Sequence, residues 1–287
     1  MRKRQIARLK SCVEYLCSLD PPRNCWNFES LSKCRTYIAQ ELEGMKYGYE
    51  LQLWKARGNE YANIITRYGD PSKPKLIVGT HYEVYGNMPG ADDNASGVAG
   101  LLEILRILKS SKQELDYCIE VVFYCLEEPP FFGTDDMGSY IHAKSLVDSG
   151  NEIKGMVCLD MIGYFSDEVD SQNFPTQELS QRYPSTANFI VAVGIKAYET
   201  FLNHFYEGML PKAEIDIQKI AFNDSDGLAG LSDQRNYWNF NIPALMINNT
   251  AFLRNANYHQ ETDLPETLDY KKMAAVVNSV ARAIQTL

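Results

Sequence analysis

The sequence predicts an α/β protein, a three-layer α/β/α sandwich in which helices cover both faces of a mixed, mostly parallel central sheet. Apolar runs at residues 75–81, 119–126 and 155–160 predict three buried strands, because each run is short and bounded by charged or turn-forming residues. Apolar residues at helical spacing follow the first run, at residues 98–108, and recur at residues 270–284. The last of these helices is expected to pack on one face of the sheet.

The segment before the first buried strand predicts two helices and a pair of strands. Residues 6–19 and 31–42 show helical periodicity, whereas residues 49–54 and 61–68 have the pattern of strands. These two strands would extend the sheet antiparallel to its parallel centre.

Length and composition predict one domain spanning residues 1–287, with the N-terminal helices (about residues 1–45) packed onto it. A single α/β domain of roughly 200–250 residues is common, and the sequence contains no linker, repeat or low-complexity tract. The 28 basic and 37 acidic residues give a net charge of -9, which argues against partners such as nucleic acid or an anionic membrane surface.

Side chains suited to metal binding follow the predicted strands. His81 ends the first buried strand, the adjacent Glu127 and Glu128 follow the second, and Asp160 ends the third. Ligand sites of open α/β sheets lie beyond the carboxyl ends of the strands, so these side chains are expected to meet. Zinc accepts histidine and carboxylate ligands, and two adjacent carboxylates in an apolar setting are costly without a cation.

Asp93 is a further candidate, in the turn between the first buried strand and the helix that follows. Either Asp92 or Asp93 could simply cap that helix, because Asp satisfies the free backbone donors of a helix start. Taken alone, the turn favours this capping role.

Four histidines are present, and two are candidates for the site. His259 follows a strand predicted at residues 242–248, but a lone loop histidine is more often solvated, so its role depends on the other candidates. His142 and His204 are expected on helix faces and are given no role.

From about residue 77 to the end, the sequence resembles the di-zinc aminopeptidase family, which is related to glutamate carboxypeptidase II and the glutaminyl cyclases. The turn Gly-Ala-Asp-Asp-Asn-Ala-Ser-Gly at residues 90–97 carries much of the resemblance. The other matching motifs follow in the family's order: the histidine at His81, the pair Glu127-Glu128, Asp160, and Tyr258-His259.

The resemblance implies two zinc ions, although cobalt or manganese suits the same ligands. It implies that Asp93 bridges both ions. His81 and Asp160 would complete one site, and Glu128 and His259 the other.

The resemblance also implies a catalytic role for three residues. Glu127 would be the general base, and Tyr258 would help zinc to stabilise the oxyanion. Glu83 stands where the family has aspartate in its His-x-Asp motif, and it would orient His81.

The function implied is removal of the N-terminal amino acid from a peptide by a metal-bridged hydroxide, which makes the partner a peptide or small amide with a free N-terminus. The sequence leaves two other functions open. One is a zinc amidohydrolase or a glutaminyl cyclase-like acyltransferase; the other is an inactive binding protein of the same fold. Loss of ligands would indicate the inactive protein, yet all five ligand positions are retained.

Substrate preference is predicted from segments that follow the strands. Their aromatic residues would suit an apolar or aromatic N-terminal side chain, or would merely cover the edge of the core. Arg254 would bind a substrate carboxylate or peptide carbonyl, or pair with a nearby acid. The aromatic residues are Phe131, Phe132, Tyr164, Phe165, Tyr237 and Trp238.

The sequence predicts a location in the cytoplasm. The basic start of the chain is not followed by the apolar run of a signal peptide, and no stretch reaches the roughly 20 apolar residues of a membrane span. Seven cysteines, an odd number without a Cys-x-x-Cys motif, are expected to be reduced thiols.

Overall fold

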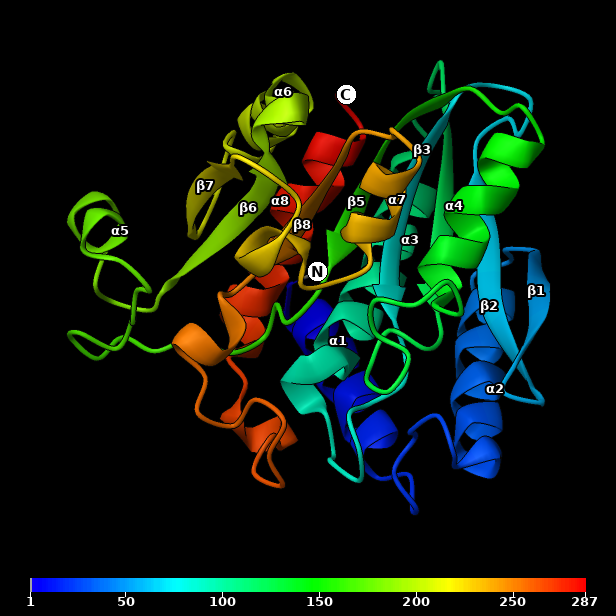
Figure 1. Cartoon of the computed structure of the whole chain (residues 1–287), viewed down its shortest axis with the longest axis horizontal. Coiled ribbons are helices and arrows are strands. Elements are labelled where there is room, and N and C mark those ends of the chain that lie inside the picture. Colours follow the sequence, from blue (N-terminus) through cyan, green and yellow to red (C-terminus); the bar gives the residue numbers. More distant parts are fainter. Residues whose placement is uncertain (1) are drawn as a thin grey trace.

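The computed structural model describes residues 2–287, within which eight strands form one sheet in the order β1-β2-β4-β3-β5-β8-β6-β7 (Figure 1). The centre of the sheet is parallel. It consists of β3 (Lys75–His81), β4 (Cys118–Tyr124), β5 (Ile153–Leu159) and β8 (Ala244–Asn248). The carboxyl ends of these four strands therefore lie along the same edge of the sheet.

Antiparallel pairing begins on either side of this centre. On one side, β2 (Asn59–Tyr68) pairs antiparallel with β4, and β1 (Tyr49–Ala56) pairs antiparallel with β2. On the other side, β6 (Phe189–Ile195) pairs antiparallel with β8, and β7 (Asp216–Phe222) is parallel to β6. The sheet is mixed, as predicted.

Helices cover both faces of the sheet (Figure 1). On one face, α3 (Gly97–Ser111) and α8 (Tyr270–Ile284) pack on each other, and α1 (Arg2–Cys17) packs against both. The same layer includes α2 (Phe28–Gly44) against α3 and α6 (Glu199–Met209) against α8. The opposite layer consists of α4 (Gly138–Asp148) and α7 (Gln234–Asn239), while the short α5 (Gln177–Arg182) lies beyond the β6 and β7 side.

The strands contribute side chains to two separate hydrophobic clusters, because successive side chains of a strand point to opposite faces of the sheet. In β3, Leu76 and Val78 belong to one cluster, whereas Ile77 belongs to the other. In β4, Val121 and Val122 are divided in the same way. Central strands buried on both faces explain why their sequences are continuous apolar runs.

The predicted three-layer fold is confirmed, and the predicted N-terminal helices pack onto it. No bounds were predicted for α4, α5, β6, α6, β7 and α7. His142 and His204, which were expected on helices, do lie in α4 and α6. A single domain over residues 1–287 stays a prediction. None of the helices between residues 2 and 287 combines the length and the apolar character that a membrane crossing needs.

Candidate metal centre

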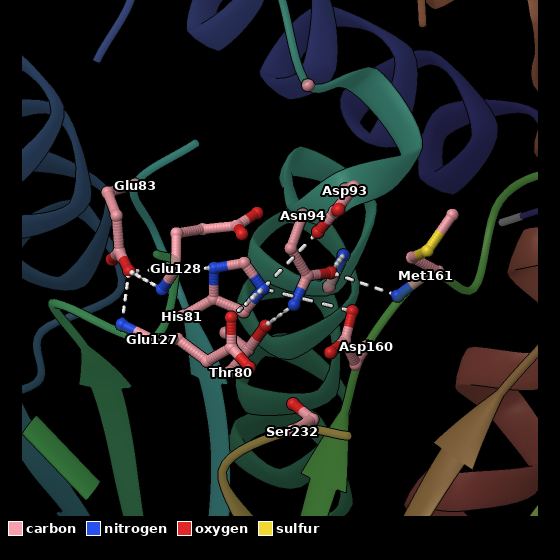
Figure 2. Close-up of polar contacts among 12 residues, drawn as sticks. Thr80, His81, Glu83, Asp93, Asn94, Glu127, Glu128, Asp160, Met161 and Ser232 are labelled. Atoms are coloured by element: carbon pink, nitrogen blue, oxygen red, sulfur yellow. Dashed lines mark hydrogen bonds and ion pairs between the residues drawn. The ribbon is translucent and has the colours of Figure 1, made fainter. Parts of the chain in front are cut away.

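The predicted site residues gather at one edge of the sheet, beyond the carboxyl ends of its parallel strands; Figure 2 shows His81, Glu83, Asp93, Glu127, Glu128 and Asp160 there. His81 is the last residue of β3, and Asp160 directly follows β5. The pair Glu127-Glu128 lies shortly after β4. Asp93 lies on the irregular helical turn η1 (Ala91–Ser96), and His259 lies in the loop after β8. Strand register thus brings together residues that are far apart in the sequence.

Asp93 lies between the two histidines. Its Oδ1 is 3.4 Å from Nε2 of His81, and its Oδ2 is 3.1 Å from Nε2 of His259. Asp160 approaches the first histidine, with Oδ1 3.8 Å from His81 Nε2. Glu128 approaches the second, with Oε2 3.4 Å from His259 Nε2. Each carboxylate oxygen of Asp93 therefore faces a different group of side chains.

The donor atoms fit divalent cations. His81, Asp93 and Asp160 offer ligand atoms within 4.8 Å of one another, and so do Asp93, Glu128 and His259. Several of these buried atoms have no hydrogen-bond partner in the described chain: Nε2 of His81, Oδ1 of Asp160 and Oε1 of Glu128. Buried polar atoms are otherwise nearly always paired. The two groups share Asp93, so the site could hold two cations bridged by that carboxylate.

Electrostatics also favour a cation. Burial and the charge of Asp93 raise the pKa of Glu128 to about 7. Burial likewise raises the pKa of Glu127 well above its ordinary value; the nearby imidazole of His81 opposes this rise, and Glu128 adds to it. For Asp93, burial acts in the same direction, but the nearby imidazoles of His259 and His81 outweigh it and lower the pKa. Crowded, buried carboxylates of this kind ionise together only when positive charge is close.

Glu127 is adjacent to both groups but belongs to neither of the two that share Asp93. Its Oε2 lies 3.9 Å from His81 Nε2, and it can be grouped with His81 and Glu128 in a third set of possible ligands. Its side chain also lines the pocket described below. Glu127 is therefore placed where a carboxylate could face a bound substrate.

Glu83 binds backbone amides rather than His81. Its Oε1 lies 4.0 Å from Nδ1 of His81, too far for a hydrogen bond. The same oxygen accepts hydrogen bonds from the backbone N–H groups of Glu127 and Glu128, the latter at 3.1 Å (Figure 2). Glu83 thus fixes the turn that presents the two glutamates, and an orienting effect on His81 stays a prediction.

Asp92 does not cap the following helix, so the simple capping interpretation of this turn does not hold for it. Its Oδ1 accepts hydrogen bonds from the backbone N–H groups of Gly163 (2.8 Å) and Tyr164 (3.1 Å). Its Oδ2 accepts from the side-chain amides of Asn249 (2.8 Å) and Asn255 (2.9 Å). Asp92 therefore joins the loops after β5 and β8 to the turn that carries Asp93.

Two more residues hold the turn in place. The carboxylate of Asp263 accepts hydrogen bonds from the backbone N–H groups of Asp92 and Asp93, the latter at 3.1 Å. The side chain of Asn94 donates to Thr80 Oγ1 at 2.9 Å and to the carbonyl of Leu159 at 3.0 Å (Figure 2). The position of Asp93 is thus fixed by contacts from several parts of the chain.

Sequence reasoning identified the five candidate ligands but missed the residues that hold them. Asp263 lies only four residues after His259, so a place near the site could have been expected for it. No sequence pattern indicates that its carboxylate binds the turn of Asp93. Tyr85, whose ring stacks on His259, lies in a loop without periodicity and gave no signal.

A largely apolar pocket opens beside the carboxylates. Four segments were expected to form its rim: residues 129–134, 227–238 and 251–255 contribute to the lining, whereas residues 162–165 do not. Of the six predicted aromatic residues, only Phe132 lines it. Phe131, Phe165, Tyr237 and Trp238 are buried in the core, and Tyr164 packs against it, so the alternative that they cover the core is correct for these five. The apolar lining includes Phe174, Leu179, Tyr183, Phe189, Val191, Val193, Ile220, Phe222, Leu228, Leu231, Met246, Phe252 and Leu253.

Arg254 was predicted to bind substrate or to pair with an acid; the pairing is wrong, and substrate binding stays a prediction. It is buried and donates to the carbonyl of Phe189 (2.7 Å) and to Oε1 of Gln172 (2.9 Å), and no carboxylate pairs with it in the described chain. Burial lowers the pKa of Arg254 to about 9. The side chain fixes one wall of the pocket.

A mixed α/β sheet with buried carboxylates and histidines at one edge is the arrangement of a candidate metal-dependent enzyme. Residues 63–284 match the sequence profile of peptidase family M28. The chain belongs to this family.

Two relatives and two solved structures illustrate the similarity. The chain is 37% identical over 283 residues to the uncharacterized protein YfbL of Escherichia coli K12, covering 95% of this chain and 85% of that protein. It is 31% identical to leucine aminopeptidase 1 of Leptosphaeria maculans over 121 residues, which cover 38% of this chain and 30% of that protein. The fold matches the Legionella pneumophila LapA aminopeptidase (TM-score 0.76, 20% identity, 99% of this chain and 74% of that one). It also matches a Bacteroides thetaiotaomicron glutaminyl cyclase (TM-score 0.73, 17% identity, 100% and 98%).

Proposed function

We propose that the protein is a zinc-dependent aminopeptidase, which releases the N-terminal amino acid from peptides or small amides. The observation that supports it best is the arrangement of two donor groups around Asp93, with Glu127 beside them at the end of an apolar pocket. Membership of a peptidase family supports hydrolysis of an amide bond. The similarity to a leucine aminopeptidase supports the choice of an exopeptidase.

In this proposal His81, Asp93 and Asp160 hold one zinc ion, and Asp93, Glu128 and His259 hold the other. Imidazole nitrogen and carboxylate oxygen are ordinary ligands of zinc, and catalytic sites use fewer protein ligands than closed structural ones. When bound, zinc lowers the pKa of a water ligand and polarises a carbonyl oxygen. The same donors suit cobalt or manganese.

Glu127 is the general base. Its carboxylate accepts a proton from the attacking water and then donates that proton to the departing amine. The hydrogen bonds from the Glu127 and Glu128 backbone to Glu83 hold this residue at the pocket. Burial raises the pKa of Glu127 in the metal-free chain, and nearby bound cations would lower it.

Tyr258 and the pocket walls position the substrate. The Tyr258 side chain lines the pocket beside His259, where its hydroxyl can donate to the developing oxyanion. Asp160 and Glu127, which also line the pocket, provide negative charge for the α-amine. The apolar walls favour a large apolar or aromatic N-terminal side chain.

Glutaminyl cyclisation is the second candidate, because a glutaminyl cyclase shares the fold over the full length of this chain. Cyclisation transfers the γ-acyl group of an N-terminal glutamine to its own α-amine and releases ammonia. Two donor groups that share one carboxylate favour a two-ion peptidase centre over this reaction.

The two functions are separated by one panel of substrates. The purified protein is incubated with leucine, phenylalanine, alanine, glutamate and lysine amides and with a peptide that begins with glutamine, with and without a chelator and re-added zinc. We expect release of free leucine and phenylalanine that stops with the chelator and returns with zinc. Conversion of the glutamine peptide to its cyclic form without release of free amino acids would establish the cyclase instead. Full activity in the chelator would contradict both.

A further inference from the structure

The imidazole of His259 is stacked against two tyrosine rings. The ring of Tyr85 lies parallel to it, with centroids 4.0 Å apart and an interplanar angle of 6°. The ring of the preceding residue, Tyr258, stacks at 3.8 Å and 20°. Both tyrosines are therefore in close contact with one candidate metal ligand.

The polar contacts described for the His259 side chain all involve Nε2, which faces Asp93 and Glu128. A metal-binding histidine usually donates its other ring N–H to a carboxylate or carbonyl, which fixes the orientation of the ring. His259 also has a backbone φ of +56°, which is uncommon outside glycine. The orientation of this ring therefore depends on packing to an unusual degree.

Tyr85 is held firmly although it lies near the surface. It belongs to the loop between β3 and η1, and the next two residues of that loop are bound by Asn24. The side-chain amide of Asn24 donates to the carbonyl of Gly86 at 2.6 Å and to Oδ1 of Asn87 at 2.9 Å. The Tyr85 side chain is 36% exposed and is not part of the pocket lining. A change at this position would thus leave the core and the described pocket walls intact.

We propose that Tyr85 is a positioning residue for the metal centre: its ring keeps the His259 imidazole in the plane that directs Nε2 toward Asp93 and Glu128. The inference rests on the proposed function, because it concerns the ion held by Asp93, Glu128 and His259. In other metal sites a hydrogen bond from the second ring nitrogen fixes the orientation of the histidine. In this site the stacked ring of Tyr85 has that role. The phenol hydroxyl is not needed for this role.

The expected effect follows from other groups that orient metal ligands. Loss of such a partner weakens metal binding by roughly 10- to 100-fold. Tyr85→Ala should therefore lower the zinc affinity of the site formed by Asp93, Glu128 and His259 by about tenfold. The affinity of the other site, formed by His81, Asp93 and Asp160, should stay close to that of wild type.

The experiment measures zinc affinity directly, by competition with a chromophoric chelator on metal-free protein. Four proteins are compared: wild type, Tyr85→Ala, Tyr85→Leu and Tyr85→Phe. We expect Ala and Leu to weaken one site selectively and Phe to restore it, because only Phe keeps the stacked ring. Tyr49→Ala is the matched control, since Tyr49 is an exposed tyrosine (39%) on the distant strand β1 and should change neither site.

The absorption bands of the cobalt-substituted proteins provide a second readout. They report the geometry at the metal, so they should change in Tyr85→Ala and Tyr85→Leu and match wild type in Tyr85→Phe. If both sites of Tyr85→Ala bind zinc with wild-type affinity, the inference is overturned while the proposed function stays intact. The same conclusion follows if Tyr85→Phe binds zinc as weakly as Tyr85→Ala. A wild-type protein that binds no zinc would overturn the proposed function and this inference together.

Discussion

Arg23 Nη2 donates a hydrogen bond of 2.8 Å to the carbonyl oxygen of Gly90, the residue that immediately precedes the turn of Asp93. The guanidinium also donates to the carbonyls of Tyr82 (2.9 Å) and Pro89 (2.8 Å). Arg23 is fully buried, and each of these partners is a neutral carbonyl. An arginine of the N-terminal segment, which precedes the region that matches the family profile, thus fixes both ends of the loop between His81 and Asp93.

Arg23→Ala should destabilise the protein by about 3 kcal/mol, because it leaves several buried carbonyls without donors. Arg23→Lys should recover only part of this loss, since an ammonium group lacks the planar fork that reaches several acceptors. Urea unfolding measures both changes, with the exposed Arg4→Ala as control. Stability equal to wild type in Arg23→Ala would show that the loop holds its position without the arginine.

The central strands and the candidate ligands at their carboxyl ends could be predicted because both depend on local patterns, whereas the roles of Asp93 and His259 depended on the family resemblance. A strand buried on two faces is a continuous apolar run, and its carboxyl end marks where a ligand will lie. The β6 sequence is such a run as well, but no pattern shows that β6 pairs antiparallel with β8. The edge strand β7 is only partly buried and interrupted by Gln218 and Lys219, so its signal is weak.

The contacts around the ligands could not be predicted, because they join residues with no local relationship. Asp92 binds Asn249 and Asn255, more than 150 positions away. From the sequence alone, Asp92 is an ordinary candidate for a helix cap. Likewise, the sequence shows that several aromatic residues follow the strands, but whether each ring lines the pocket or packs in the core depends on tertiary packing.

Glu127→Gln should leave zinc content near wild type and reduce kcat by roughly 10²- to 10⁴-fold, because only proton transfer is lost. Zinc is measured by elemental analysis and turnover with leucine amide. The adjacent Glu128→Gln is the comparison, since Glu128 faces His259 and its change should lower metal content. Unchanged turnover in Glu127→Gln would mean that another residue is the base.

Asp93→Ala should remove both zinc ions, because its two oxygens face His81 and His259 separately. Asp160→Ala should affect mainly the ion near His81, since Asp160 belongs to only one donor group. Metal content after dialysis distinguishes the variants, with the exposed Asp170→Ala as control. Two ions retained in Asp93→Ala would contradict the bridging role.

Gly90→Ala should impair metal binding through the backbone. Gly90 has a φ of +63°, and a Cβ there would overlap with the side chain of Val84 and the carbonyl oxygen of Asp93. Gly86→Ala is a matched control, because Gly86 also has a positive φ, +49°, but has open space around it. We expect backbone strain to lower the stability of Gly86→Ala by roughly 1 kcal/mol, without loss of zinc. Gly90→Ala should lose more stability than this and should also lose zinc. Equal behaviour of the two variants would show that crowding at Gly90 has no role.

Glu120 should make stability depend on pH, far from the metal centre. Its buried carboxylate contacts Lys75 (2.6 Å), Arg67 (2.5 Å) and Nε2 of His142 (3.2 Å). Burial alone would raise the pKa of Glu120, but the hydrogen bonds and charges of these partners outweigh it and lower the pKa below the ordinary 4.5. Because the folded pKa lies below the unfolded one, the stabilisation is fully present above about pH 4.5 and is lost as the pH falls further.

Glu120→Gln should therefore lower the free energy of unfolding by about 3 kcal/mol at pH 7, because it leaves Lys75 as a buried charge without a counter-ion. It should also flatten the decline of stability below pH 4.5, since the group that takes up the proton is gone. Urea unfolding of metal-free protein from pH 7 to pH 3.5 measures both effects. Glu50→Gln is the matched control: Glu50 contacts the same Arg67 at 2.6 Å but is 55% exposed, so its loss should cost less than 1 kcal/mol. If wild type and Glu120→Gln lose stability in parallel below pH 4.5, Glu120 does not supply this pH dependence.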